Sequence, residues 1–473
     1  MDEQRGTEQP EAAAQQQELL ALGERLVELA LASGAEHAEA VLGRSRYLSA
    51  TVRGGEPEKL EEAEGRSLGL RVVREGRMAT ASSADATEEH ALLRETVRRF
   101  AEEQLAPQAR EHDRAERFNL ELFRQLGELG LLGLTVSEEM GGAGMDATAA
   151  AIVHEELAAA DAGFTLAYLA HAVLFANNLE RNGSEAQRRR YLPAACRGEI
   201  VGGLCMSEPD AGTDVLGMQT TAERKGDRYL LTGRKMWITN GALDDERPGD
   251  VFLVYARMAG HSRHQVSLFL VERGFPGFSV GQRIKDKLGM RASGTAELVF
   301  EQCEVPAECL VGEEGGALMH MMRNLEIERL GLAAMGVGIG RRALEIMNAY
   351  ASERQAFGKP IRRFGQVQRH LADSYAQWMA GRCYVYETAR RMDLDRPGHR
   401  LDSDGVKLYC ATMAKEVADR AIQVLGGYGY VGEYDVERLW RDAKLLEIGG
   451  GTLEAHQKNM AADLGRLERL GLA

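Results

Sequence analysis

The hydrophobic pattern changes twice along the chain after residue 86, and the order of these changes constrains the fold more than any other feature. Residues 87–200 show the periodicity of amphipathic helices, with breaks at Gly141-Gly142 and Asn182-Gly183. Residues 201–313 instead form short alternating runs punctuated by Gly and Pro, as antiparallel strands do. Helical periodicity then returns from about Gly316 to the C-terminus. This α, β, α succession predicts a multidomain α+β protein with domains at 84–200, 201–313 and 314–473.

The N-terminal residues precede this succession and have a different character. Residues 1–14 are polar and are expected to form a disordered tail. A helix is predicted from Gln15 to Ala32, followed by short alternating segments and a turn at Glu75-Gly76. We therefore expect a small α/β extension over residues 15–83.

Composition excludes several classes of function. The net charge of −14 and the lack of a long basic run argue against nucleic-acid binding. The six cysteines are scattered without C-x-x-C spacing, so we expect neither a disulfide framework nor a metal site, and a reducing, cytoplasmic setting. No signal or transit peptide is visible. The apolar run Ala162–Leu179 is interrupted by His171 and by Asn177-Asn178, which favours a buried helix over membrane insertion.

One helix of the last domain places a carboxylate on an apolar face. At helical spacing, one stripe contains four apolar residues and one acidic residue: Met321, Leu325, Glu328, Leu332 and Met335. A carboxylate that faces a core is costly unless it is paired or takes up a proton. A salt bridge from Glu328 to Arg323 or Arg329 is one interpretation, and a general base is the other.

Two loops carry further information. The G-x-G-x-x-G match at 427–432 follows the helical run Thr412–Leu425 rather than a strand, so we reject a dinucleotide-binding fold. Residues 206–214, "MSEPDAGTD", form a loop whose backbone N–H groups and hydroxyls suit a polar ring edge or a phosphate. Downstream, Trp237 and Thr239 of "WITN" add an aromatic wall and a further hydroxyl.

These motifs together resemble the acyl-CoA dehydrogenase family over about residues 85–473. The resemblance rests on "MSEPDAGTD", "WITNGA", "DKLGMRASGTAEL", "LEIERL", "ERQAFGKPI", "QVLGGYGY" and "RDAKLLEIGGGT", all in the family's order. It implies a helical N-terminal domain, a β middle domain, a C-terminal four-helix bundle, bound FAD and a homotetramer. It also implies oxidation of an acyl-CoA substrate with transfer of electrons to electron-transferring flavoprotein.

The resemblance implies a set of FAD-binding residues. Arg354 is expected to reach the FAD diphosphate of a neighbouring subunit, and Gln366 stands one position later than the family's usual Gln after Phe364. The remaining cofactor contacts implied are Leu204, Cys205, Met206, Ser207, Glu208, Pro209, Asp210, Ala211, Gly212, Thr213, Trp237, Ile238, Thr239, Gln423, Val424, Leu425, Gly426, Gly427, Thr452, Leu453 and Glu454.

The resemblance also bears on the catalytic base. Many members take the base from the loop position that is Gly450 here, whereas a subset that includes the isovaleryl-CoA enzymes takes it from the helix position of Glu328. Glu328 is therefore implied as base, with the Gly450 N–H as a donor to the thioester carbonyl. The implied substrate-binding residues are Thr213, Glu326, Arg329, Gly449, Gly450 and Gly451.

The two glycines also suggest the substrate. Straight-chain members usually carry Tyr and Glu where this chain has Gly449 and Gly450, so room beside the β-carbon favours a short or medium branched acyl group such as isovaleryl. A long straight chain is the alternative. Two other possibilities are a flavin oxidase or monooxygenase on the same scaffold, and a passive flavoprotein module with a binding role led by the extension.

The extension resembles the opening segment of the TldD/PmbA metallopeptidase family. The segments "LVELALASGAEHAEAVLGRSR" and "LGLRVVREGRMATASS" carry this resemblance. The family's H-E-x-x-x-H zinc motif is missing, because His154-Glu155 is followed by Ala159 where a second His is needed. The sequence therefore lacks the zinc ligands that a peptidase activity of this family would need.

Overall fold

A computed structural model describes residues 5–32, 34–53, 56–74, 77–83, 88–245 and 247–467. The chain divides into two compact units, Met1–Leu93 and Arg94–Ala473, which are described separately.

The first unit contains one helix and an antiparallel sheet. Its elements are α1 (Arg5–Ala32), β1 (His37–Arg53), β2 (Glu56–Arg74) and β3 (Arg77–Ser83), with the strands in the order β1-β2-β3. The prediction of a disordered tail over residues 1–14 is wrong for residues 5–14, which extend α1 because their Ala, Gln and Glu residues are strong helix formers. The turn predicted at Glu75-Gly76 lies outside the described residues.

The second unit begins within α2 and opens with a helical region. Its elements are α2 (Glu88–Phe100), η1 (Ala101–Leu105), α3 (Ala106–Ala115), α4 (Leu120–Glu128), η2 (Glu138–Met140), α5 (Ala147–Ala160), α6 (Ala162–Leu169), η3 (Ala170–Asn177), α7 (Asn178–Asn182) and α8 (Glu185–Cys196). The run from Ala162 to Leu179 is a largely buried succession of helical turns, as expected. His171 accepts a hydrogen bond from the Gly202 N–H through Nδ1 (3.0 Å), so its Nε2 donates to the Ala195 carbonyl at 3.1 Å.

An eight-stranded sheet follows. Its elements are β4 (Gly202–Cys205), η4 (Val215–Gly217), β5 (Thr221–Lys225), β6 (Arg228–Thr239), β7 (Val251–Met258), β8 (Val266–Glu272), β9 (Phe278–Arg283), β10 (Thr295–Pro306), η5 (Ala307–Cys309) and β11 (Leu310–Val311). The path is β11-β8-β7-β5-β6-β10-β9, with β4 paired to β7. Most pairs are antiparallel, but β4 and β5 both run parallel to β7, which the expected antiparallel domain did not include.

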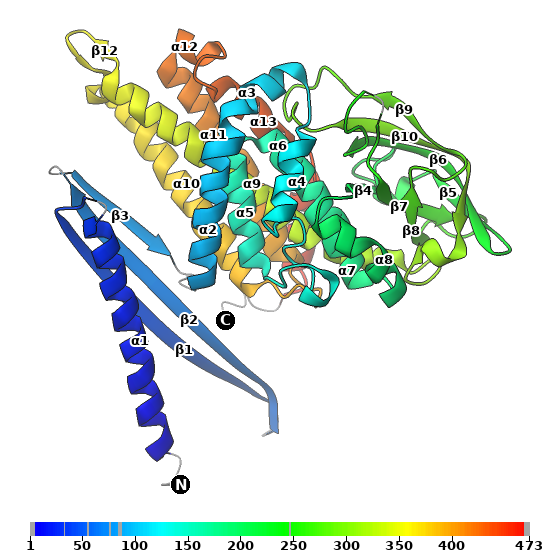
Figure 1. Cartoon of the computed structure of the whole chain (residues 1–473), viewed down its shortest axis with the longest axis horizontal. Coiled ribbons are helices and arrows are strands. Elements are labelled where there is room, and N and C mark those ends of the chain that lie inside the picture. The colour runs from blue at the N-terminus through cyan, green and yellow to red at the C-terminus, as the bar shows by residue number, and fades with distance from the viewer. Residues whose placement is uncertain are drawn as a thin grey trace. The chain divides into compact units, whose positions relative to one another are not determined.

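The C-terminal region returns to helices. Its elements are α9 (Ala317–Glu353), β12 (Gln355–Ala356), β13 (Lys359–Pro360), η6 (Ile361–Arg363), α10 (Gly365–Arg391), α11 (Arg400–Leu425), α12 (Gly427–Tyr430), α13 (Val436–Leu446) and α14 (Leu453–Leu464). Helix α9 packs against α5, α10, α11 and α13, and the sheet lies to one side of these helices (Figure 1).

Helix α9 belongs to both hydrophobic cores of this unit. Near its N-terminus, Met321 and Leu325 pack into the core of the β-sheet. Further along, Leu332 and Met335 belong to the core of the helical bundle. The expected apolar stripe is therefore real, and Glu328 lies on it between the two cores.

A buried ion network joins α5 to three other helices. Arg94 of α2 contacts Glu155 (3.1 Å) and also Glu156, which further binds Arg98 and Arg341. Burial disfavours the charged carboxylates, yet the surrounding guanidinium groups hold the pKa of Glu155 below its usual value. The ionised state of this pair thus depends on side chains from α2.

We expect the second unit to fold without the extension. Deletion of residues 1–83 removes α1 and the three-stranded sheet but leaves Arg94 in place. The melting temperature of the remaining protein, and its content of the FAD that the sequence resemblance implies, should therefore match the full chain. Thermal unfolding and the flavin absorbance test this expectation.

Arg94→Met in the full chain is the contrasting variant. It leaves buried Glu155 and Glu156 with one fewer counter-charge and should destabilise the protein by about 3 kcal/mol. A truncated protein less stable than this variant would show that the extension supports the second unit.

Candidate active site

Glu328 is a buried carboxylate without a counter-ion in contact. It is 9% exposed, and burial raises its pKa to about 7, although Arg329 and Lys407 oppose the shift. Among the described residues no cation lies within ion-pair distance of Glu328. Arg323 instead donates to the Arg181 carbonyl (3.0 Å), and Arg329 pairs with Asp404 (2.9 Å). The geometry therefore favours the general-base interpretation over the salt bridge.

The loop between α13 and α14 faces this carboxylate. Gly450 and Gly451 both have left-handed backbone conformations, with φ of 66° and 106°. A Cβ atom built on Gly450 would lie 3.5 Å from Glu328 Oε1 and only 2.4 Å from Leu332 Cδ1. A side chain at position 450 would therefore begin beside the carboxylate of Glu328. Leu332 leaves no space for such a side chain.

A polar cluster lies beside the same loop. Asp404 Oδ1 contacts Arg329 at 2.9 Å and His456 Nδ1 at 2.6 Å. Arg329 Nε also donates to the Gly450 carbonyl (3.4 Å), and His456 Nε2 lies 3.0 Å from the Gly451 carbonyl. Lys407 donates to that carbonyl at 2.6 Å, and burial lowers the pKa of Lys407 to about 7.

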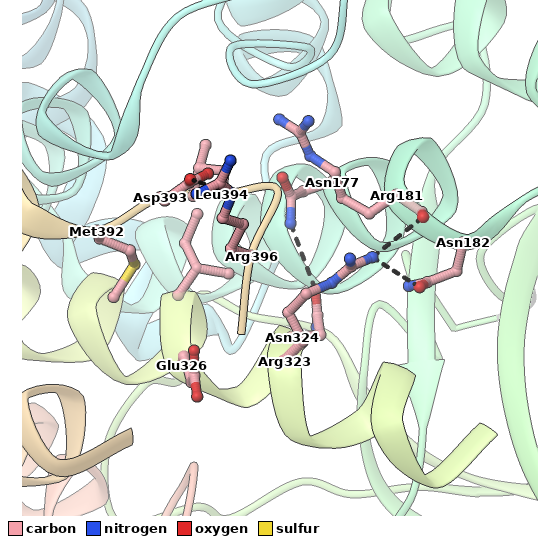
Figure 2. Close-up of a pocket in the computed structure, with 11 residues that line it drawn as sticks. Asn177, Arg181, Asn182, Arg323, Asn324, Glu326, Met392, Asp393, Leu394 and Arg396 are labelled. Atoms are coloured by element: carbon pink, nitrogen blue, oxygen red, sulfur yellow. Dashed lines mark hydrogen bonds and ion pairs between the residues drawn. The ribbon is translucent and has the colours of Figure 1, made fainter. Parts of the chain in front are cut away.

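A polar pocket lies beside the first turns of α9 (Figure 2). Figure 2 shows Arg323 directed toward Asn182, to which it donates at 2.8 Å, and Asn324 facing Asn177. Glu326 also lines the pocket, and its carboxylate accepts from the backbone N–H groups of Gly398 and His399 at 3.4 and 3.2 Å. Of the predicted substrate-binding residues, Glu326 thus borders a pocket, while the guanidinium of Arg329 is directed into the polar cluster.

A buried lysine binds the predicted cofactor loop, residues 204–213. Lys235 of β6 is fully buried and pairs with Glu208 at 2.9 Å, and it donates to the Met206 carbonyl at 3.0 Å. Glu208 also accepts from the N–H groups of Gln219 and Thr220. Both oxygens of the Glu208 carboxylate therefore have partners within the protein. Leu204 and Cys205 lie in β4 and Ala211 is buried, whereas the loop surface is formed by Pro209, Asp210, Gly212 and Thr213.

Trp237 lies in a β-bulge of β6 that leaves its side chain exposed. The pairing of β6 with β10 shifts between the Lys235–Leu298 and Ile238–Ala296 partners, so two residues of β6 oppose one of β10. Trp237 lies in this bulge with φ of 59° and is 55% exposed. The Ser207 carbonyl accepts from the Met236 N–H at 2.9 Å and joins the loop to this bulge. A flat apolar ring beside a loop with open space around Gly212 fits a planar flavin.

The other predicted cofactor residues lie on separate surface segments. Arg354 is exposed at the end of α9, and Gln366 is exposed in the first turn of α10. Helix α11 ends at Leu425, before Gly426 with φ of 62°. Gln423, Gly426 and Gly427 are exposed there, Val424 is half-buried and Leu425 is buried. Thr452 caps α14 by accepting from the Ala455 N–H, followed by half-buried Leu453 and exposed Glu454.

Comparisons with known proteins agree with this arrangement. The chain matches the family models of the acyl-CoA dehydrogenase N-terminal domain (residues 87–199), middle domain (203–303) and C-terminal domain (316–465). It is 44% identical over 378 residues to mitochondrial isovaleryl-CoA dehydrogenase of Pongo abelii, covering 78% of this chain and 87% of that protein. The chain belongs to the acyl-CoA dehydrogenase family.

Solved structures support the same assignment. The butyryl-CoA dehydrogenase of Megasphaera elsdenii superposes with a TM-score of 0.77 at 35% identity, covering 81% of this chain and 100% of that one. A glutaryl-CoA dehydrogenase of Mycobacterium smegmatis in complex with FADH2 gives 0.75 at 30% identity, covering 81% and 96%. The expected fold and the FAD cofactor are confirmed.

The extension matches a second family. Residues 38–107 match the model of PmbA/TldA metallopeptidase domain 1, as the sequence resemblance predicted. That match overlaps the dehydrogenase N-terminal domain over residues 87–107. His154, from the incomplete zinc motif, is buried with its Nδ1 2.7 Å from the Ala150 carbonyl. Within the described residues no group of three or more His, Cys, Asp or Glu side chains could hold a metal.

Sequence reasoning missed the residues that surround Glu328 and its loop. Three of these residues are fully buried: Asp404, Lys407 and His456. Nothing in the sequence of their helices distinguishes them from polar residues on an exposed face. Lys235 was missed for the same reason. The alternation of the strand, which places Lys235 on the same face as the buried Tyr229 and Leu231, was the one available signal.

Two alanine substitutions test the packing of the glycine loop. Gly450→Ala adds a methyl group that overlaps Leu332 and requires a positive φ, so it should destabilise the protein by about 1–2 kcal/mol or more. Gly449→Ala is the matched control, because its added Cβ meets only ordinary contacts with Leu445. Urea unfolding distinguishes the two, and equal stability of the variants would contradict the described overlap.

Proposed function

We propose that this chain is an FAD-dependent acyl-CoA dehydrogenase that oxidises a short or medium branched-chain acyl-CoA across the α,β bond, with Glu328 as base. The observation that supports this proposal best is the convergence of the buried Glu328 carboxylate and the Gly450 loop. FAD, when bound, accepts the β-hydrogen as hydride. The protein's own task is to remove the α-proton and to stabilise the enolate that forms.

Glu328 is suited to proton abstraction by its surroundings. A carboxylate with a pKa of about 7 is a stronger base than one with the usual value, because burial disfavours its charge. The α-hydrogen of a thioester is weakly acidic, and matching the pKa values lowers the cost of the transfer. Arg329 and Lys407 keep part of the Glu328 population ionised near neutral pH.

Gly450 would serve the second task. With no side chain at this position, the loop backbone can approach a substrate beside Glu328, and the Gly450 N–H can donate to the thioester carbonyl. A donor aimed at developing negative charge typically contributes about 3 kcal/mol to the transition state. The predicted contacts of Gly449, Gly451, Glu326, Arg329 and Thr213 with substrate belong to the same proposal.

The proposed acyl group follows from the space at the loop. A Cβ on Gly449 would meet only Leu445 at ordinary contact distances, while Leu332 forms an apolar wall next to Gly450. A methyl branch fits such a space, and the isovaleryl-CoA dehydrogenases of other organisms are relatives of this chain. These points favour the branched substrate over the long-chain alternative and over an oxidase or a passive binding module.

The cofactor residues predicted from the sequence keep their proposed roles. The loop over residues 204–213 and Trp237–Thr239 would hold the flavin ring, while Gln366, Gln423–Gly427 and Thr452–Glu454 would contact the remainder of FAD. Arg354 would reach the FAD of a neighbouring subunit. We propose a homotetramer, since Phe357 and Tyr430, close in sequence to these residues, are 94% and 84% exposed.

Electron-transferring flavoprotein is the proposed electron acceptor, and the cytoplasm the proposed location. The described residues contain no helix that is long and apolar enough to cross a membrane.

Glu328→Gln tests the base. Gln keeps the volume of the side chain, so FAD binding should persist while flavin reduction by isovaleryl-CoA falls at least about 100-fold. In the unaltered protein the reduction rate should rise from about pH 6 to about pH 8, because the raised pKa leaves Glu328 protonated on the acid side. Stopped-flow absorbance measures both. Reduction of the variant at the normal rate would refute the assignment of the base.

A substrate panel tests the acyl group. We expect kcat/KM for isovaleryl-CoA to exceed that for butyryl-, octanoyl- and palmitoyl-CoA by about tenfold, because one methylene of fit is typically worth about 1–3 kcal/mol. The assay uses an artificial electron acceptor and equal enzyme concentrations. A tenfold preference for octanoyl- or palmitoyl-CoA would exclude the branched substrate and retain the dehydrogenase assignment.

A further inference from the structure

The loop that faces Glu328 has a backbone that needs external support. It contains three consecutive glycines, Gly449 to Gly451, and two of them adopt left-handed conformations. Glycine loses more conformational freedom on ordering than any other residue, so such a loop is costly to hold in one shape. One backbone bond closes it, from the Leu453 N–H to the Glu447 carbonyl at 3.3 Å.

Side chains bind two successive carbonyls of this loop. Arg329 donates to the Gly450 carbonyl at 3.4 Å. Lys407 donates to the Gly451 carbonyl at 2.6 Å, and His456 Nε2 lies 3.0 Å from the same oxygen. These side chains come from α9, α11 and α14, so the loop is held between three helices.

One carboxylate oxygen joins two of these side chains. Asp404 Oδ1 lies 2.9 Å from Arg329 and 2.6 Å from His456, and Asp404 is fully buried. Its second oxygen, Oδ2, has no hydrogen-bond partner among the described residues. A buried carboxylate with a single engaged oxygen is costly for stability alone, which argues that its position serves the groups it orients.

We propose that Asp404 and His456 are positioning residues that clamp the Gly450–Gly451 backbone over Glu328. Asp404 orients Arg329 and His456, and these two side chains fix the Gly450 and Gly451 carbonyls together with Lys407. Fixing both carbonyls sets the peptide planes on either side of Gly451. The first of these planes contains the Cα of Gly450, so the clamp anchors the residue whose N–H is proposed as the donor. The inference rests on the proposed function only in assigning this N–H to the thioester carbonyl.

Amide hydrogen exchange tests the clamp directly in the FAD-loaded protein. Asp404→Asn removes the charge that holds Arg329 and His456, so exchange at the Leu453 amide, which closes the loop, should accelerate at least about tenfold. His456→Leu keeps a buried side chain but loses both polar contacts, and it should act in the same direction. The matched control is Asp463→Asn, which breaks a pair with Arg400 between the same two helices, α14 and α11, and should leave Leu453 unchanged.

Kinetics provides the second readout. If the clamp aims the Gly450 N–H, then Asp404→Asn should lower kcat for isovaleryl-CoA about tenfold or more while KM changes less than about threefold, because the donor acts mainly in the transition state. Bound FAD should stay at one per chain. Normal exchange at Leu453 in both Asp404→Asn and His456→Leu would overturn the clamp. A lack of flavin reduction by any acyl-CoA in the unaltered protein would instead overturn the proposed function, while the exchange data still decide the clamp.

Discussion

The burial of one carboxylate between two hydrophobic cores is the constraint on which the active site depends. Helix α9 begins in the core of the sheet through Met321 and continues in the core of the bundle through Leu332. Glu328 lies between these two residues, where water has little access. The pKa of about 7 follows from this position rather than from any neighbouring acid. A 37-residue helix that packs into both cores holds the proposed base on a rigid element.

Two loops near the site are each held by a buried ion pair. Lys235 and Glu208 anchor the loop that precedes Trp237, and Arg329 and Asp404 anchor the loop that contains Gly450. In both cases the pair also binds backbone atoms, so the charge fixes the path of a loop. Such pairs contribute little net stability, but breaking one is expensive. They therefore serve to give a surface loop one conformation.

The sequence predicted the fold and the burial of Glu328 because both rest on local patterns, whereas the role of Glu328 as base was implied by the family resemblance and is a proposal. The stripe that contains Glu328 is a matter of helical spacing, and the α, β, α order is visible in the periodicity. The cluster around Asp404 could not be predicted, because Arg329, Asp404 and His456 meet only when α9, α11 and α14 pack together. The parallel pairing of β4 and β5 with β7 was missed for the same reason. Residues 5–14 were misjudged because a polar composition predicts exposure and does not exclude a helix.

The geometry also explains why a base on the helix and a base on the loop exclude each other. A side chain on residue 450 would start 3.5 Å from the Glu328 carboxylate and would have to displace Leu332. A carboxylate carried on that Cβ would lie beside the Glu328 carboxylate, and two like charges held together disfavour the ionisation of both, so one would hold a proton. Once Glu328 supplies the carboxylate, residue 450 must be small, and its left-handed φ of 66° makes glycine the residue that fits. That glycine leaves the loop without side chains to hold it, and the polar cluster at Asp404 supplies the missing contacts.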